Sequence, residues 1–153
     1  MVKVSLFVMI YSLICCCTPQ IEALQSVLTD SACRGRMTFK NVTVTAYYPI
    51  DEEDNSIENM DIKGHALATL QDYFDNTVDY VTVSMDENLH IPYATQICIP
   101  ELDEHYRRHI NFQVRDTASN VKGRGVRRVD ICVRSEADSY DHAVNLKQAT
   151  VVF

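Results

Sequence analysis

Carboxyl groups are the side chains of this sequence best suited to chemistry, and three aspartates stand beside segments patterned as β-structure. Asp86 and Asp116 each follow directly on an alternating apolar segment. Asp130 lies within such a segment, opposite in direction to apolar Val129 and Ile131. A carboxyl buried beside other carboxyls can acquire a raised pKa and serve as a general acid and base. Any one of the three alone would be expected to be a solvated surface aspartate.

Other patterns that could do chemistry are weak. His105 and His109 are four residues apart, but the segment between them lacks the glutamate of a zinc-protease helix. We therefore expect a solvated loop there. The glycines Gly123 and Gly125 belong to a run too short for a phosphate-binding loop, and no Gly-x-Ser-x-Gly motif occurs. The sequence thus predicts no metal site and no cofactor.

The elements that must position the aspartates are mostly strands. Alternation of apolar and polar residues, rich in β-branched side chains, predicts half-buried strands. There are six of them, at 42–46, 81–85, 97–99, 110–114, 129–133 and 151–153. Short helices are expected at 67–74 and 135–143, and the acidic segment 51–61 reads as an exposed loop. This pattern favours a small, mainly β barrel over a parallel α/β fold.

The N-terminus is typical of a secretory signal peptide. Lys3 precedes an uncharged apolar run at 4–17, and Pro19 and Ala23 follow it. The run is short for a membrane span of roughly 20 residues. We expect cleavage near Ala23, which removes residues 1–23 and leaves a secreted chain with no stable membrane insertion. An uncleaved signal anchor is the alternative.

Three cysteines remain after that cleavage, in a compartment where disulfides persist. Cys98 and Cys132 alternate with apolar strand residues, so each is expected to be a buried thiol or part of a cross-strand disulfide. We predict a bridge between these two, with Cys33 unpaired or linking two chains. Asn41, in the triplet Asn-Val-Thr, is a candidate glycosylation site.

Composition and charge limit the classes of function that the protein can have. The 153 residues are 46% hydrophobic and 23% charged, which suits one globular domain. The formal net charge is −7. An acidic chain is poorly suited to binding a phosphate backbone, so no nucleic-acid partner is expected.

Taken in order, several segments resemble the three-aspartate (3D) domain, a family found in MltA-type lytic transglycosylases and small secreted cell-wall proteins. The matching segments are Thr45-Ala46-Tyr47-Tyr48-Pro49, 64–69, Val83-Ser84-Met85-Asp86, 91–95, 116–123 with Val129-Asp130, and Ala143 with 149–153. The resemblance implies a six-stranded double-psi β-barrel over residues 42–153, preceded by a lead segment at 24–41.

The resemblance also implies roles in cleaving peptidoglycan or a related polysaccharide. Asp130 would be the acid and base of a lytic transglycosylase reaction. Asp116 would polarise it and stabilise an oxocarbenium-like transition state, and Asp86 would shape the site or bind sugar. The candidate sugar contacts are Lys122, Tyr47 and Lys63.

Two departures from the family pattern leave other functions open. Ala118 and Ser119 stand where the family has glycines. The interval from Asp116 to Asp130 is 14 residues, longer than is usual in the family, and it contains an arginine-rich insertion. A non-catalytic, expansin-like polysaccharide-binding module and a secreted effector remain alternatives.

Overall fold

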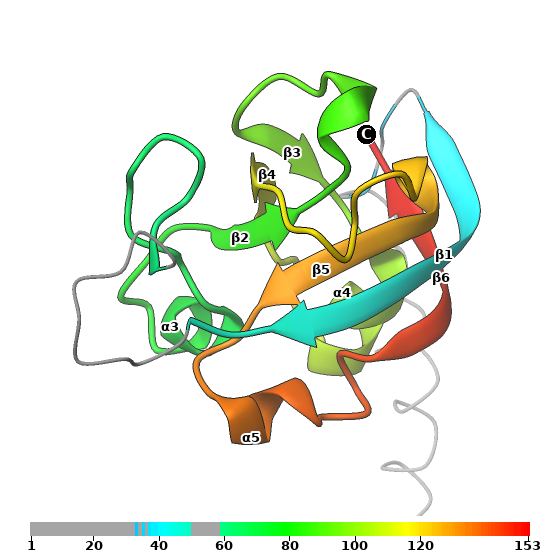
Figure 1. Ribbon diagram of the computed structural model, residues 1–153. Helices are drawn as coiled ribbons and strands as arrows, with labels where there is room; N and C mark the ends of the chain where they lie inside the picture. The colour runs from blue at the N-terminus through cyan, green and yellow to red at the C-terminus, as the bar shows by residue number, and fades with distance from the viewer. Residues whose placement is uncertain (1–32, 34, 36, 50–58) are drawn as a thin grey trace, which may run out of the picture.

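The computed structural model describes residues 33, 35, 37–49 and 59–153. Within these ranges the chain forms a mainly β structure with a few short helices (Figure 1). The elements are β1 (Thr38–Tyr47), α3 (Leu70–Phe74), β2 (Val81–Ser84), the 3₁₀ turn η2 (Glu87–Leu89), β3 (Thr95–Ile97), α4 (Pro100–Tyr106), β4 (Phe112–Asp116), the 3₁₀ turn η3 (Gly125–Arg127), β5 (Arg128–Cys132), α5 (Glu136–Ser139) and β6 (Leu146–Val152).

The strands form one curled sheet of mixed direction, in the order β3-β4-β2-β5-β1-β6. The pairs β1–β5 and β2–β4 are parallel, whereas β1–β6, β2–β5 and β3–β4 are antiparallel. An isolated antiparallel bridge joins Cys98, just after β3, to Val152 at the end of β6. The two edge strands therefore meet at one end, and the sheet wraps about half a barrel.

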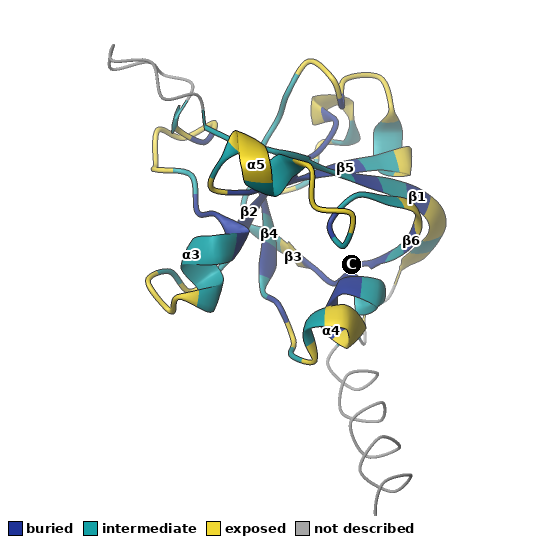
Figure 2. Ribbon diagram, turned by 90° about the horizontal axis from the view of Figure 1, so that it is seen from below, coloured by how far each residue is buried: buried dark blue, intermediate teal, exposed yellow. Residues whose placement is uncertain are grey.

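Apolar residues of the strands build the core, and β2 and β5 are buried along almost their whole length. Val44, Val83 and Ile131 are fully buried and belong to one apolar cluster, to which all six strands of the curled sheet contribute. Most of the buried residues lie on the strands, while the short helices are half-buried or exposed apart from Leu70 of α3 and Leu102 and Asp103 of α4 (Figure 2). The predicted mainly β fold with six strands is confirmed.

Two local predictions need correction. The predicted loop from His105 to His109 is correct only after Tyr106, because His105 belongs to the helix α4; this helix begins at Pro100, whose fixed φ suits the first helical position. The sheet begins at Thr38, inside the predicted lead segment, because Met37 and Phe153 exchange backbone hydrogen bonds of 3.4 and 2.9 Å. The predicted signal peptide, 1–23, and most of the acidic segment lie outside the described residues.

The predicted Cys98–Cys132 bridge is wrong. Cys98 forms a disulfide with Cys33, at a Cα–Cα distance of 5.4 Å, and Cys132 is a buried free thiol. In the sheet, β4 and β2 separate β3 from β5, and three strand spacings amount to about 14 Å, beyond the reach of a disulfide. No helix among the described residues is long and apolar enough to span a membrane.

Candidate functional site

Sheet register places two of the predicted aspartates in one row. Ser84 of β2 pairs with Asp116 of β4 on one side and with Asp130 of β5 on the other, and Asp130 pairs in turn with Thr45 of β1. Directly paired residues project to the same face of a sheet. The two aspartates are two strands apart, so their Cα atoms lie about 10 Å from each other.

A bulge in β4 turns Asp116 into this row. Val83 pairs with Val114, but the next residue of β2, Ser84, pairs with Asp116, so Arg115 is the extra residue. Without the bulge, Asp116 would share the core-facing side of Val114. Bulges of this kind redirect a side chain beside functional sites.

Asp116 has the carboxyl best placed for proton transfer. Burial raises its pKa, and the nearby Asp61 carboxylate adds to the rise. The Tyr47 hydroxyl donates a hydrogen bond of 2.9 Å to Oδ2 of Asp116. Burial likewise raises the pKa of Tyr47 well above its ordinary value, so this hydroxyl stays protonated and acts as a donor. The predicted residue Tyr47 thus lies at the site.

Asp130 is enclosed instead. Its side chain is fully buried and accepts hydrogen bonds from the Thr45 hydroxyl, the Asn120 amide and Nε of Arg128, the last at 2.9 Å. Arg128 also reaches the Thr45 hydroxyl at 3.1 Å. These contacts occupy both carboxylate oxygens and tie β1, β5 and the connection between β4 and β5 together.

Asp86 holds a turn. Its carboxylate accepts the backbone N–H of Gly125 at 2.7 Å and two hydrogen bonds from Asn88, at 3.1 Å from the backbone and 2.9 Å from the side chain. The Gly125 hydrogen bond is the largest cause of a lowered pKa at Asp86. Asp86 is therefore ionised at neutral pH and fixes the start of η3.

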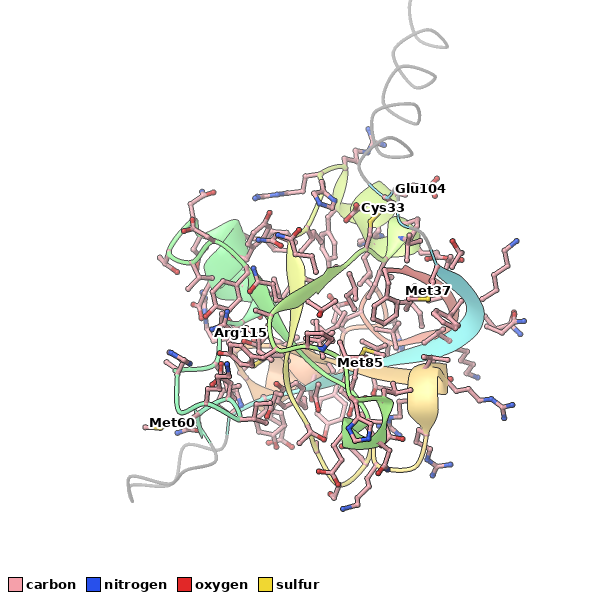
Figure 3. All side chains as sticks on the ribbon, turned by 90° about the horizontal axis from the view of Figure 1, so that it is seen from above. Cys33, Met37, Met60, Met85, Glu104 and Arg115 are labelled. Atoms are coloured by element: carbon pink, nitrogen blue, oxygen red, sulfur yellow. A yellow bond between two sulfur atoms is a disulfide. The ribbon has the colours of Figure 1, made fainter. Side chains whose placement is uncertain are left out.

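A cleft of about 500 Å³ opens beside this row. Its walls include Asp86 and Asp116 but not Asp130, so the structure brings two of the three aspartates to one opening. The other wall residues are Ile62, Met85, Glu87, His90, Ile91, Tyr93, Val114, Arg115 and Thr117. Met85 and Arg115 are labelled in Figure 3.

A buried ion pair that the sequence did not indicate supports the cleft. Asp61 is 5% exposed and accepts hydrogen bonds from Arg115 at 3.2 Å, from the Tyr93 hydroxyl and from two backbone N–H groups. Burial opposes ionisation of Asp61, but these hydrogen bonds outweigh it and lower the pKa to about 2. Burial and Asp61 raise the pKa of Tyr93 to about 12. In the sequence, Asp61 is the last residue of the acidic segment 51–61, so it was expected to lie in a solvated loop.

The predicted lysines lie near the cleft. Nζ of Lys63 stands 4.2 Å from the centre of the Tyr93 ring, and Arg115 stacks on the same ring at 4.6 Å. Lys122 forms an ion pair of 2.6 Å with Glu87, a cleft residue, at the exposed surface. Asn41, the candidate glycosylation site, is exposed on β1.

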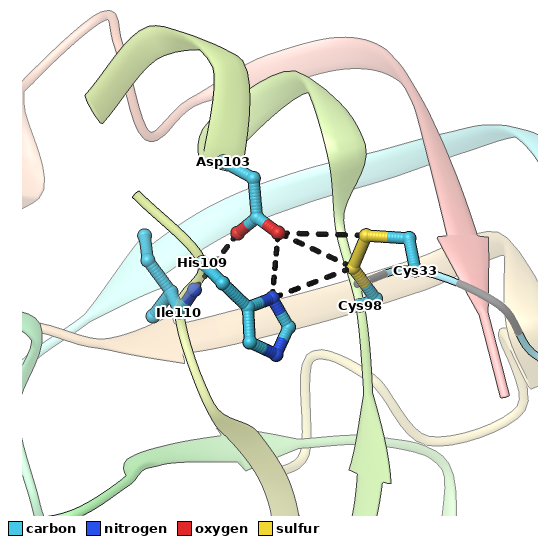
Figure 4. The surroundings of a disulfide bond; sticks show 5 residues. All are labelled: Cys33, Cys98, Asp103, His109 and Ile110. Carbon is cyan, nitrogen blue, oxygen red and sulfur yellow. Dashed lines mark hydrogen bonds and ion pairs between the residues drawn. A yellow bond between two sulfur atoms is a disulfide. The ribbon is translucent and has the colours of Figure 1, made fainter. Parts of the chain in front are cut away.

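The disulfide has a polar environment of its own (Figure 4). The buried Asp103 carboxylate lies 3.4 Å from each sulfur and 2.8 Å from Nδ1 of His109, and its other oxygen accepts the Ile110 N–H at 2.9 Å. The ligand-type atoms of Cys33, Cys98, Asp103 and His109 all lie within 4.8 Å of one another. Metals bind thiolates, however, and sulfurs joined in a disulfide are not thiolates. In its oxidised form this cluster joins the N-terminal segment to α4.

The row of paired residues, the cleft and the buried Asp61–Arg115 pair thus form one connected site. Ser84 adds one further feature, since its hydroxyl is fully buried between Asp116 and Asp130 and has no hydrogen-bond partner among the described residues.

No family model matches this chain, and no curated protein matches it in sequence.

Proposed function

We propose that this is a secreted polysaccharide-active protein with a double-psi β-barrel, and that its cleft cleaves glycan strands of the peptidoglycan type by lytic transglycosylation. The observation that carries the proposal is Asp116, a partly buried carboxyl with a raised pKa on the wall of an open cleft. The order of motifs along the chain supports the same reading, and the disulfide is typical of extracellular proteins.

The reaction needs one carboxyl that changes protonation state and no water nucleophile. Asp116 in its acid form donates its proton to the glycosidic oxygen, and the bond from that oxygen to the anomeric carbon breaks. The resulting carboxylate then takes the proton of the sugar's own C6 hydroxyl. The C6 oxygen bonds to the anomeric carbon and closes a 1,6-anhydro ring, so Asp116 ends the cycle protonated. General acid–base catalysis of this kind contributes about 10²–10⁴-fold.

The geometry favours Asp116 over Asp130 as the acid. Both oxygens of Asp130 are occupied by Thr45, Asn120 and Arg128, and Asp130 does not line the cleft. We assign Asp130 to positioning the connection between β4 and β5. Asp86 is the ionised carboxylate on the same wall, suited to stabilising positive charge that develops on the sugar ring.

Conservative variants test these roles. Asp116→Asn should abolish cleavage of purified peptidoglycan while retaining sedimentation with it. A raised pKa means that the charged Asp116 carboxylate destabilises the fold once the pH exceeds the group's ordinary range. Asp116→Asn should therefore unfold at the same temperature as wild type, or higher, at pH 7.

Two further variants complete the comparison. Asp130→Asn should lower the unfolding temperature, because it breaks a buried ion pair. The matched control is Asp79→Asn, at an exposed site that does not line the cleft, which should change neither property. Full cleavage by Asp116→Asn would refute its role as the acid.

A non-catalytic binding module is the second candidate. The enclosure of Asp130 favours it, because that aspartate matches the position expected for the acid and has no free oxygen. This candidate predicts that wild type and Asp116→Asn sediment equally with peptidoglycan and that neither releases soluble fragments.

A further inference from the structure

A second concave surface lies on the connection between β4 and β5. A groove of about 600 Å³ is lined by Thr43 together with Gly123, Arg124, Gly125, Arg127 and Arg128. Half of the lining residues are arginines, and none is acidic or aromatic. This concentration of positive charge is unexpected in a protein of net charge −7.

The groove carries positive charge that the ion pairs among the described residues do not neutralise. Arg128 is paired with Asp130, which lies beneath it. Arg124 and Arg127 are exposed, and no carboxylate among the described residues lies within ion-pair distance of either. Two guanidinium groups therefore face solvent beside a third that is held in place.

The backbone of the groove is fixed rather than loose. The Asp86 carboxylate binds the Gly125 N–H at 2.7 Å, and Val121 is fully buried beneath the turn. Hydrogen bonds of 3.0 Å from the Arg124 N–H to Val121 and of 3.2 Å from the Arg127 N–H to Arg124 continue the turn, and η3 packs against β1. A site held this way loses little conformational freedom when a ligand binds.

We propose that this groove binds the carboxylate or sulfate groups of an acidic polysaccharide. A guanidinium group presents paired N–H donors that match the two oxygens of such groups. Nucleic acid fits less well, because the groove offers no aromatic ring on which a base could stack and the protein is acidic as a whole. Asp86 connects the groove to the cleft, since it lines the cleft and holds the groove's turn. The choice of a polysaccharide rests on the proposed function; the choice of an anionic group rests on the groove alone.

Binding of defined polymers tests the proposal. The full mature chain is titrated with dextran sulfate, with polygalacturonate and with neutral dextran at two salt concentrations. We expect salt-sensitive binding of at least one polyanion and none of dextran. Binding of only one polyanion identifies the group that the groove accepts.

The variant Arg124→Gln/Arg127→Gln should weaken polyanion binding by about tenfold or more, because it removes two charge-assisted contacts. The matched control Arg107→Gln/Arg108→Gln removes the same charge at the end of α4 and should bind within about twofold of wild type. Thermal unfolding of both variants checks that they fold. Equal weakening in the two variants, or no polyanion binding by wild type, would overturn the proposal.

Peptidoglycan cleavage by the same variants separates this inference from the proposed function. If wild type binds polyanions through the arginines but does not cleave peptidoglycan, the catalytic proposal is refuted and the proposed anion-binding groove stands. If wild type cleaves peptidoglycan but the arginine variant binds polyanions as wild type does, the groove proposal is refuted and the catalytic proposal stands.

Discussion

Replacing Asp61 by asparagine tests the buried ion pair beneath the cleft. The pKa of Asp61 is about 2, against an ordinary value of 3.8. This difference corresponds to about 2 kcal/mol of stability at neutral pH. Because the pKa is lowered on folding, that stability is fully present above about pH 4 and is lost as the pH falls toward 2.

Asp61→Asn should therefore lower the free energy of unfolding at pH 6 by at least about 2 kcal/mol. An amide also leaves some of the donors around Asp61 without a good acceptor, which adds to the loss. At pH 2 the gap between wild type and variant should narrow by about 2 kcal/mol, because Asp61 is then protonated in the unfolded chain and about half protonated in the folded protein.

Urea unfolding at a series of pH values measures both quantities. Other carboxylates also titrate in acid, but they do so in both proteins, so the difference between the two curves isolates Asp61. Asp79→Asn, on the exposed surface, should track wild type at every pH. Parallel curves for wild type and Asp61→Asn would contradict the lowered pKa and the reasoning built on it.

Three further predictions concern the cysteines and the tyrosine beside Asp116. Cys98→Ser removes a disulfide whose cysteines are 65 residues apart. On the chain-entropy account this should lower the free energy of unfolding, measured in urea, by about 4 kcal/mol. Peptide mapping that pairs Cys98 with Cys132 would contradict the Cys33–Cys98 bridge. Burial raises the pKa of the Cys132 thiol to about 12, so iodoacetamide should label it at pH 8 only after unfolding; rapid labelling of the native protein would show that it is accessible. Tyr47→Phe removes a hydrogen bond that lowers the pKa of Asp116, so the alkaline limb of the cleavage profile should move to higher pH; an unchanged limb would separate Tyr47 from the acid.

The strands could be predicted because each one is short, alternating and rich in β-branched residues. Val129, Ile131 and Val133 alternate with polar or small residues, and all three are fully buried. Strand order and register could not be predicted, because they depend on pairings between distant segments. The bulge at Arg115, which turns Asp116 away from the core, exists only in the pairing of β4 with β2.

The candidate site was predictable only in part, for the same reason. Asp86 and Asp116 share a cleft, whereas the family resemblance implied that all three aspartates belong to one site. The enclosure of Asp130 depends on Asn120, which reaches it from the connection between β4 and β5, and on Arg128 of its own strand. Cys33 stood in a segment without periodicity, so nothing local indicated that it would meet Cys98.

The identity of the fragments released from purified peptidoglycan tests the central claim most directly. Wild type should release fragments that end in 1,6-anhydro sugars, each one water lighter in mass than the corresponding hydrolysis product, and Asp116→Asn should release none. Hydrolysed ends from wild type, or anhydro ends from Asp116→Asn, would contradict a lytic transglycosylase reaction with Asp116 as its acid and base.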